Sequence, residues 1–324
     1  MNSDTEENIK CGIVYDPVFE KHQTGLGHPE QKNRASFIFQ KLQDQKLLQF
    51  TKNIPVQQCT FETLSLAHNQ EYLRRSKKEI DTGLSSLSTG DTAICDQTWN
   101  VASCATGGII NAVKEVVAGR LENAFCITRP PGHHASSDKG MGFCLFNHVA
   151  IAARYAQKKL GIQKILIVDW DVHHGNGTQD IFYEDNSIFF FSTHQSPWYP
   201  GTGGREEKGT GQGLGYNLNY PFPAGSGKKE ILDYAFASEL PKYMTLFKPE
   251  LIIISAGFDS RINDPLGQFQ LEDQDFFELT KIIIDLAKEY ANGKVISVLE
   301  GGYNLNGLAS SSIAHLQALL GKNR

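Results

Sequence analysis

The segment DWDVHH (169–174) contains three residues with the types and spacing of metal ligands. Asp169, Asp171 and His173 occupy alternate positions, so at the end of an extended strand their side chains point to one face. Two carboxylates and one imidazole suit a borderline-soft divalent cation, with zinc as the leading candidate. Asp259 offers a further carboxylate. Because these groups lie so close together, we favour a metal site over a helix N-cap among buried polar residues.

Two further motifs supply groups that could move protons or stabilise charge. RPPGHH (129–134) presents His133 and His134 at a turn that two prolines and a glycine make rigid. These imidazoles are candidates for metal ligands or for a proton-transfer pair beside a metal-bound water, and two surface histidines are the plain alternative. EGGYN (300–304) carries Tyr303, whose hydroxyl could donate to an oxyanion. An ordinary core tyrosine fits that motif equally well.

Short apolar runs rich in β-branched and aromatic residues predict the strands that position these motifs. Near-continuous apolar runs are typical of parallel strands buried on both faces. The segments between them have helical periodicity, so the sequence predicts an α/β fold with a doubly wound sheet. The predicted strands are 11–16, 123–128, 164–170, 187–192, 250–256 and 294–300. The predicted helices are 99–119, 147–160, 228–247, 273–292 and 308–320.

Each of the four polar motifs begins where a predicted strand ends. The strands at 123–128, 164–170, 250–256 and 294–300 lead into RPPGHH, DWDVHHGNGTQ, FDS and EGGYN, respectively. In an open α/β sheet, ligands bind outside the carboxyl ends of the strands. We therefore expect the four motifs to meet at one site.

The composition of the 324 residues is that of a globular protein. With 40% hydrophobic residues and 21% charged residues, the chain is unlike a disordered one. A net charge of −5 and the lack of a Lys/Arg run argue against direct nucleic-acid binding. The sequence contains no apolar stretch of membrane-spanning length, roughly 18 residues. The start, MNSDTEENIK, resembles neither a secretory signal nor a transit peptide, so we expect a cytoplasmic enzyme of one domain.

Cysteines and glycines give two further indications. The six cysteines form no C-x-x-C pair, which favours reduced, buried thiols over disulfides or a cysteine-ligated zinc. Residues 201–215 hold seven glycines but lack the Gly-Lys-Ser/Thr of a phosphate loop. We expect this segment to be a flexible loop near the site.

Four segments together resemble the zinc-dependent histone deacetylase superfamily, on its class II side: RPPGHHASSDKGMGFCLFNHVAIAA, ILIVDWDVHHGNGTQDIFY, SAGFDSRINDPLG and LEGGYNL. That superfamily includes bacterial deacetylase-like amidohydrolases and acetylpolyamine amidohydrolases. The resemblance extends from about Gly12 to Leu320 and implies the arginase/deacetylase fold, a mostly parallel central sheet flanked by helices on both faces. We accordingly expect a polar N-terminal tail at 1–10 and a single catalytic domain at 11–324.

The resemblance implies one zinc ion per chain, held by Asp171, His173 and Asp259. Of the four candidates from spacing, Asp169 would instead hydrogen-bond His133. A zinc-bound water would then attack the acetyl carbonyl.

A structural monovalent cation, usually potassium, is also implied by the resemblance. Asp169 would help to enclose it. Its other ligands would be largely backbone carbonyls around Asp171, His173, Ser192 and Thr193.

The resemblance assigns catalytic roles to the remaining polar residues. His134 would act as general base on the water and then as general acid to the leaving amine, while His133 would stay charged. Tyr303 would donate its hydroxyl to the carbonyl oxygen. Asn176, where class I enzymes carry Asp, would partner His134 and leave its pKa lower than a carboxylate would. Some class II relatives have His in place of the tyrosine and deacetylate acetyl-lysine poorly, so Tyr303 predicts a competent deacetylase.

The resemblance also implies an apolar tunnel for the acylated side chain. Gly142, Phe143 and Tyr199 would form its walls, and flat aromatic faces suit a butylene chain. Leu266 stands where polyamine-selective eukaryotic relatives place Glu, so the tunnel mouth has no electrostatic preference for a cationic amine. Arg34 resembles an arginine of the inner cavity where acetate leaves, with a helix-surface arginine as the alternative.

The expected function is therefore removal of acetyl groups from Nε-acetyl-lysine of peptides or proteins. The alternative within the same chemistry is hydrolysis of an acetylpolyamine or another small acetylated amine. A zinc-containing binding protein without turnover conflicts with the intact histidine pair and tyrosine. An arginase-like binuclear manganese enzyme would need a second set of bridging ligands that the motifs lack. We expect neither nucleic-acid nor membrane binding, and the oligomeric state stays open.

Overall fold

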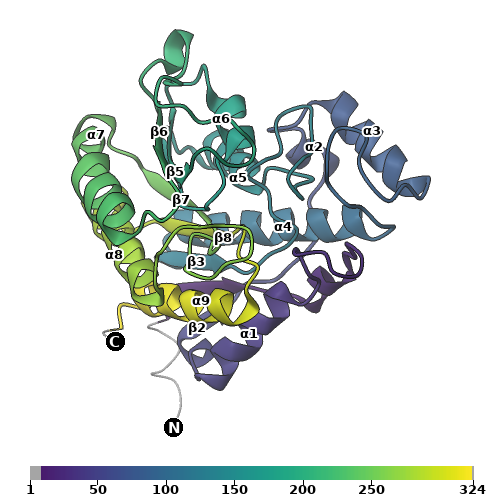
Figure 1. Cartoon of the computed structure of the whole chain (residues 1–324), viewed down its shortest axis with the longest axis horizontal. Coiled ribbons are helices and arrows are strands. Elements are labelled where there is room, and N and C mark those ends of the chain that lie inside the picture. The colour runs from purple at the N-terminus through teal and green to yellow at the C-terminus, as the bar shows by residue number, and fades with distance from the viewer. Residues whose placement is uncertain (1–8, 323–324) are drawn as a thin grey trace.

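The computed structural model describes residues 9–322, which form an α/β fold around one eight-stranded sheet (Figure 1). Neighbouring strands all run parallel, in the order β2-β1-β3-β8-β7-β4-β5-β6. The strands are β1 (Cys11–Val14), β2 (Thr51–Asn53), β3 (Asn123–Cys126), β4 (Ile165–Asp169), β5 (Ile188–Gln195), β6 (Asn217–Phe222), β7 (Leu251–Ala256) and β8 (Val295–Leu299). Residues 1–8 of the predicted N-terminal tail lie outside the described range.

Helices pack on both faces of the sheet. They are α1 (Arg34–Asp44), α2 (Phe61–Leu64), α3 (Gln70–Asp81), α4 (Thr98–Val117), α5 (His148–Leu160), α6 (Asn176–Phe182), α7 (Leu240–Phe247), α8 (Asp273–Tyr290) and α9 (Leu305–Leu319). Short 3₁₀ turns occur at Pro17–Lys21, Leu48–Phe50 and Gly211–Gly213, and a π-helical segment, Lys229–Glu239, leads directly into α7. One core lies mainly beneath α1, α7, α8 and α9, and the other beneath α3, α4 and α5 (Figure 1).

The central strands are buried on both faces, which explains why their sequences are continuous apolar runs. In β7, Ile252 and Ile254 belong to one core, whereas Leu251 and Ile253 belong to the other. Successive side chains point to opposite faces of a strand, so a sheet covered on both faces must be apolar at every position. The prediction of a parallel sheet with helices on both faces is confirmed.

Local capping fixes the ends of α5, which follows the first histidine motif. The side chain of Asn147 accepts a hydrogen bond from the backbone of Ala150, as an N-cap residue does. Gly161 ends the helix with φ 78°, a left-handed conformation that favours glycine. The predicted helix at 147–160 therefore matches the observed one to within a residue.

Both outermost strands were absent from the predicted set. β2 and β6 are the two edges of the sheet, and their sequences, TKN and NLNYPF, lack an apolar run. Pro221 in β6 cannot donate to a strand ladder, but an edge strand has one side that needs no donor. The predicted helix at 228–247 is in fact the π-helical segment followed by α7.

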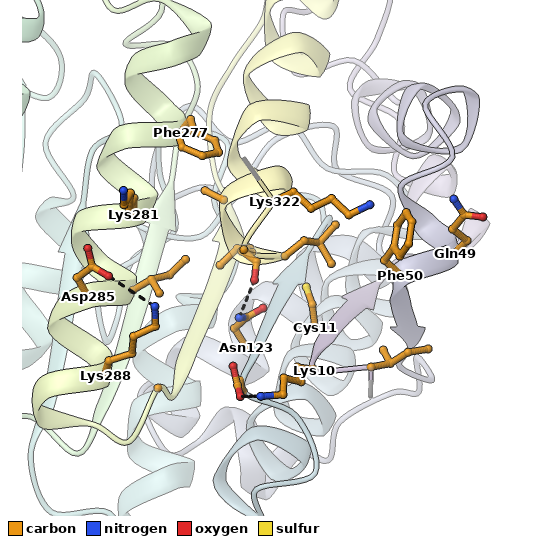
Figure 2. Close-up of a pocket in the computed structure, with 18 residues that line it drawn as sticks. Lys10, Cys11, Gln49, Phe50, Asn123, Phe277, Lys281, Asp285, Lys288 and Lys322 are labelled. Atoms are coloured by element: carbon orange, nitrogen blue, oxygen red, sulfur yellow. Dashed lines mark hydrogen bonds and ion pairs between the residues drawn. The ribbon is translucent and has the colours of Figure 1, made fainter. Parts of the chain in front are cut away.

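A cavity of about 780 Å³ lies at the amino ends of β1 and β3 (Figure 2), and none of the residues that line it belongs to the four polar motifs. Cys11 and Asn123, the first residues of β1 and β3, line it together with residues of α8 and α9. Its labelled lysines include Lys10, which pairs with Glu122, and Lys288, which pairs with Asp285 (Figure 2). Within residues 9–322, no helix is both long and apolar enough to cross a membrane.

Candidate active site

Asp171, His173 and Asp259 form a compact cluster of potential metal ligands. Their ligand atoms lie within 4.8 Å of one another, and all three residues are buried. His173 Nδ1 lies 2.9 Å from Asp171 Oδ1 and 3.2 Å from Asp259 Oδ2. β4 and β7 are neighbours in the sheet, so the residues that follow them meet at the carboxyl edge.

The carboxylates of the cluster favour a positive charge at its centre. Burial alone would lower the pKa of His173, but the carboxylates of Asp171 and Asp259 outweigh it and raise that pKa to about 10. Burial and the Asp171 charge raise the pKa of Asp259 to about 7. Asp259 Oδ2 makes no hydrogen bond within the described residues. Two buried carboxylates and an imidazole therefore fit a divalent cation, and this donor set suits zinc.

The EGGYN loop passes so close to these carboxylates that it requires glycine. A Cβ atom on Gly301 would lie 1.9 Å from Asp259 Oδ2 and 2.6 Å from Asp171 Oδ2. The Gly301 backbone N–H instead donates to Asp171 Oδ2 at 2.8 Å. Glycine thus allows close approach, and the backbone orients a candidate ligand.

Both imidazoles of the RPPGHH motif lie beside the cluster, each with its own acceptor. Nδ1 of His133 lies 2.9 Å from Asp169 Oδ2, and Nδ1 of His134 lies 2.8 Å from Asn176 Oδ1. The two rings are 4.0 Å apart between centroids. Of the four ligands predicted from spacing, Asp171, His173 and Asp259 form the cluster. Asp169 lies outside it and pairs with His133.

The two histidines have opposite electrostatic environments. Burial opposes a charge on His133, but the carboxylates of Asp169 and Asp171 outweigh it and raise its pKa to about 10. Burial, followed by the charges of His133 and His173, holds the pKa of His134 well below its usual value. His133 is therefore an imidazolium and His134 a neutral imidazole near pH 7, which is the protonation a general base needs.

Tyr303 and Arg34 lie together near the carboxylate of Asp259. The guanidinium of Arg34 stands 4.9 Å from the centre of the Tyr303 ring. It donates to the carbonyl oxygens of Gly302 and Glu300 at 2.7 and 2.6 Å. Arg34 is fully buried, so the alternative of a helix-surface arginine is wrong. Burial raises the pKa of Tyr303 well above its usual value, so the hydroxyl keeps the proton it would donate.

A cavity of about 230 Å³ leads from the surface to these groups. Its walls are Asp91, His134, Gly142, Phe143, His173, Trp198, Tyr199, Leu266 and Tyr303. All four predicted tunnel residues thus lie together with the candidate base and oxyanion donor. Phe143 holds its ring there with φ 68°, a strained backbone for a non-glycine residue.

Sequence reasoning missed two residues of this mouth. Trp198 donates its indole N–H to the carbonyl oxygen of Leu266 at 2.9 Å, which joins two rim loops. Asp91 Oδ1 accepts from the backbone N–H of Gly142 at 2.6 Å and from the Tyr199 hydroxyl at 3.3 Å. The exposed aromatic pair in PWYPG could have pointed to Trp198, whereas nothing in the spacing around Asp91 marks it.

The glycine-rich segment 201–215 is anchored beside the site. Glu207 Oε1 accepts from the backbone N–H groups of Gly203 and Gly204 at 3.0 and 2.8 Å. Its other oxygen accepts from Gln179 of α6. A Cβ on Gly203 would lie 2.4 Å from His194 Nε2, so this glycine is needed for close packing. The predicted proximity to the site is borne out, and the flexibility stays a prediction.

The predicted potassium ligands lie next to one another across two strands. Asp169 is the register partner of Ser192 in the β4–β5 ladder. The hydroxyl of Thr193 is buried and has no hydrogen-bond partner among the described residues. The potassium site itself stays a prediction.

Comparisons with known proteins agree with this geometry. The family model of the histone deacetylase domain matches residues 28–319. A probable deacetylase of Archaeoglobus fulgidus is 36% identical over 313 residues, covering 96% of this chain and 86% of that protein. Histone deacetylase 9 of Homo sapiens is 37% identical over 99% of this chain, which spans only 35% of the human protein.

A solved structure supports the same assignment. The crystal structure of the HDA15 HD domain superposes with a TM-score of 0.90 at 34% identity, covering 97% of this chain and 89% of that one. The fold and the site thus define a hydrolase of acetylated amides, with an α/β fold of the arginase/deacetylase type. The chain belongs to the histone deacetylase family. Members of this family are zinc-dependent in general, and the Asp171 cluster is the possible metal site here. The cytoplasmic location and the domain bounds stay predictions.

Proposed function

We propose that this deacetylase removes acetyl groups from Nε-acetyl-lysine in peptides or proteins, with one zinc ion per chain. The observation that supports this proposal most directly is the cavity of about 230 Å³. Its walls include Phe143, Tyr199 and Leu266 together with His134 and Tyr303. Aromatic and aliphatic walls suit the four-carbon stem of lysine and exclude water from the inner end. Asp171, His173 and Asp259 would hold the zinc.

The neutral imidazole of His134 is the group that moves the proton. Its Nδ1 atom donates to Asn176 Oδ1, which leaves Nε2 as the acceptor. It takes a proton from the attacking water and later returns it to the leaving amine. His133, held charged by Asp169, stabilises the negative charge that develops nearby. When bound, zinc would polarise the acetyl carbonyl and lower the pKa of a water molecule.

Tyr303 stabilises the oxygen of the acetyl carbonyl as it gains charge. Its hydroxyl keeps its proton because burial raises its pKa, and Tyr303 lines the cavity into which the substrate would enter. The ring is fixed by Arg34 on one side and by Phe143, whose centroid is 6.1 Å away. A positioned oxyanion donor is typically worth about 3 kcal/mol.

Two residues of the mouth favour different substrates. Leu266 offers no charge to attract a second ammonium group, which supports acetyl-lysine. Asp91 places a carboxylate at the same mouth, and this observation supports the second candidate, a small acetylated amine with a further positive charge. Asp91 already accepts two hydrogen bonds, from Gly142 and Tyr199, so we rank acetyl-lysine first. A potassium ion enclosed near Asp169 belongs to the same proposal, supported by the unpaired hydroxyl of Thr193.

The test compares an acetyl-lysine peptide with acetylputrescine and acetylspermidine on the zinc-loaded protein. We expect kcat/KM to favour the peptide by about tenfold or more. Tyr303→Phe should lose about 10²–10³-fold in kcat on the preferred substrate. Tyr199→Phe is the matched control, because it removes a hydroxyl from the same cavity without touching the proposed oxyanion donor. A polyamine preference would instead establish the second candidate.

A further inference from the structure

The carboxylate of Glu300 lies where the histidine loop and the tyrosine loop meet. Glu300 directly follows β8 and is completely buried. Its Oε2 atom accepts hydrogen bonds from the backbone N–H groups of Gly132 and His133, at 2.6 and 3.1 Å. The side chain therefore holds the backbone at the point where the RPPGHH motif presents its histidines.

Glu300 is also the first residue of the loop that carries Tyr303. Its own backbone N–H donates to Ala256 O at 3.1 Å, and its carbonyl oxygen accepts from Arg34 at 2.6 Å. The next residue, Gly301, donates to Asp171 Oδ2. The loop that begins at Glu300 thus carries Tyr303 and binds Asp171, one of the candidate metal ligands. The Glu300 side chain connects this loop to the backbone of the histidine turn.

The histidine turn has little freedom to find another acceptor. A Cβ on Gly132 would lie 2.8 Å from Phe146 O and 2.9 Å from the His148 backbone nitrogen, so the turn packs directly on the start of α5. Leaving these two buried backbone N–H groups without an acceptor would destabilise the turn in its present arrangement. Loss of the carboxylate would therefore push the turn toward another arrangement.

Stability alone does not explain a buried polar side chain of this length at this position. Glu300 Oε1 is buried without a hydrogen-bond partner among the described residues. Burying a carboxylate that is only partly satisfied is destabilising. The Glu300 side chain instead positions the histidine turn, because its Oε2 atom binds two consecutive backbone N–H groups, those of Gly132 and His133.

We propose that Glu300 is a positioning residue for deacetylation, which sets the distance between the His133–His134 pair and Tyr303. This proposal rests on the proposed function. The carboxylate itself touches no reacting atom and acts through the backbone of Gly132 and His133. Misplacing a catalytic group by about 1 Å can cost about 10²-fold in rate.

Three variants separate placement from charge. Glu300→Gln keeps the length and an accepting oxygen, so kcat should stay within about threefold of wild type. Glu300→Asp keeps the charge but withdraws the oxygen by one methylene, and Glu300→Ala removes it. Both should lose about 10²-fold in kcat while KM stays within about twofold. An active Glu300→Asp together with an inactive Glu300→Gln would overturn the proposal. Comparing these two variants tests the role of Glu300 even where Glu300→Ala fails to fold.

Amide hydrogen exchange supplies a readout that needs no substrate. The Gly132 and His133 amides should exchange about tenfold faster in Glu300→Asp than in wild type. The matched control is Asp275→Ala, which removes a buried carboxylate that accepts from the backbone of Glu272 at 2.8 Å. This control should leave kcat and the two amides unchanged. Unaltered exchange in Glu300→Asp would overturn the proposal.

Turnover and amide hydrogen exchange test the proposed function and the role of Glu300 separately. A wild-type protein that hydrolyses neither an acetyl-lysine peptide nor an acetylpolyamine would refute the proposed function. The exchange of Gly132 and His133 would still decide whether Glu300 holds the histidine turn. In a His134→Ala background, Glu300→Ala should add little to the loss of kcat, because the group it positions is already gone. Fully additive losses would point to a general structural role and overturn the proposal.

Discussion

Nδ1 of His134 lies 2.8 Å from Oδ1 of Asn176, the first residue of α6. The Asn176 amide group also contacts Met141 Sδ through its Nδ2 atom, at 3.5 Å, which orients the oxygen toward the histidine. A neutral amide accepts the Nδ1–H without adding charge. The pKa of His134 is held low mainly by burial and then by the charges of His133 and His173, which outweigh the opposite effect of Asp171.

Replacing this amide by a carboxylate should raise the pKa of His134. In Asn176→Asp the imidazolium gains a negative partner at hydrogen-bond distance, an effect of about one to three pH units. A general base must be neutral to act, so the acidic limb of the kcat/KM profile should move to higher pH. The measurement is a pH–rate profile on an acetyl-lysine peptide.

Asn69→Asp is the matched control for that variant. Asn69 caps α3 by accepting from the Tyr72 backbone N–H, a role that Asp fills equally well. The substitution adds the same charge at a side chain that bonds Tyr72 and not His134, so it should leave the profile in place. An unchanged profile in Asn176→Asp would contradict the role given to His134.

The sequence predicted the central sheet well because burial on both faces leaves a simple pattern. The runs that became β4 and β7 are apolar at almost every position, and each ends in a polar motif. The edges carried no such pattern, since β2 is the three-residue segment TKN and is partly exposed. Parallel strands also explain why the sequence predicts that RPPGHH, DWDVHH, FDS and EGGYN converge, since the carboxyl ends of such strands meet at one edge of the sheet.

The sequence predicts those site residues whose type and spacing within one segment indicate their chemistry. It does not predict residues whose role depends on contacts with distant parts of the chain. Asp171 and His173 stand two positions apart, so one segment reveals both. The carboxylate of Glu300 reaches a backbone 167 positions away, and nothing in EGGYN shows that the target is the His133 amide. The same applies to Asp91, whose partners Gly142 and Tyr199 lie far along the chain.

Removal of the metal should lower thermal stability. Asp171, His173 and Asp259 bring two buried carboxylates together, and a cation bound there stabilises the folded state by mass action, about 4 kcal/mol at 1,000 times Kd. We expect a chelator to lower Tm by several degrees and to abolish turnover, and zinc to restore both. Elemental analysis should give about one zinc per chain.

Asp259→Asn tests whether this cluster is the site of that effect. The variant removes one carboxylate, so its Tm should no longer respond to chelator or zinc. Asp275→Asn, which changes a buried carboxylate at the start of α8, should respond as wild type does. Two manganese ions per chain with no response to zinc would support the arginase-like alternative.

Substrate preference should follow the charge at position 266. Leu266 lines the mouth of the cavity, and its backbone oxygen is held by the Trp198 indole. Leu266→Glu adds a carboxylate beside the path of a second ammonium, so kcat/KM for acetylspermidine should rise about tenfold relative to an acetyl-lysine peptide. Leu266→Gln has the same shape without the charge and should not shift the ratio. Equal effects of Glu and Gln would show that shape, not charge, sets selectivity at this mouth.

Acid should destabilise the fold through buried neutral histidines, of which His148 is the clearest case. One ring nitrogen of His148 lies 3.1 Å from Pro130 O in the histidine motif, and the other lies 2.9 Å from the Thr106 hydroxyl. Burial lowers the pKa of His148 from 6.5 to about 4. Its unfolded form therefore binds a proton at a higher pH than its folded form, so the stability is complete above about pH 6.5 and is lost as the pH falls toward 4.

The magnitude of this loss can be measured by urea unfolding at pH 7 and pH 5. A histidine with pKa values of 6.5 unfolded and about 4 folded loses about 2 kcal/mol of unfolding free energy over that interval. His148→Gln cannot titrate, so its unfolding free energy should fall by about 2 kcal/mol less than that of wild type. His28→Gln is the control, because His28 is only half-buried and should change this difference less. A wild-type pH dependence in His148→Gln would show that other groups control acid unfolding and that the turn beneath Pro130 tolerates a charged His148.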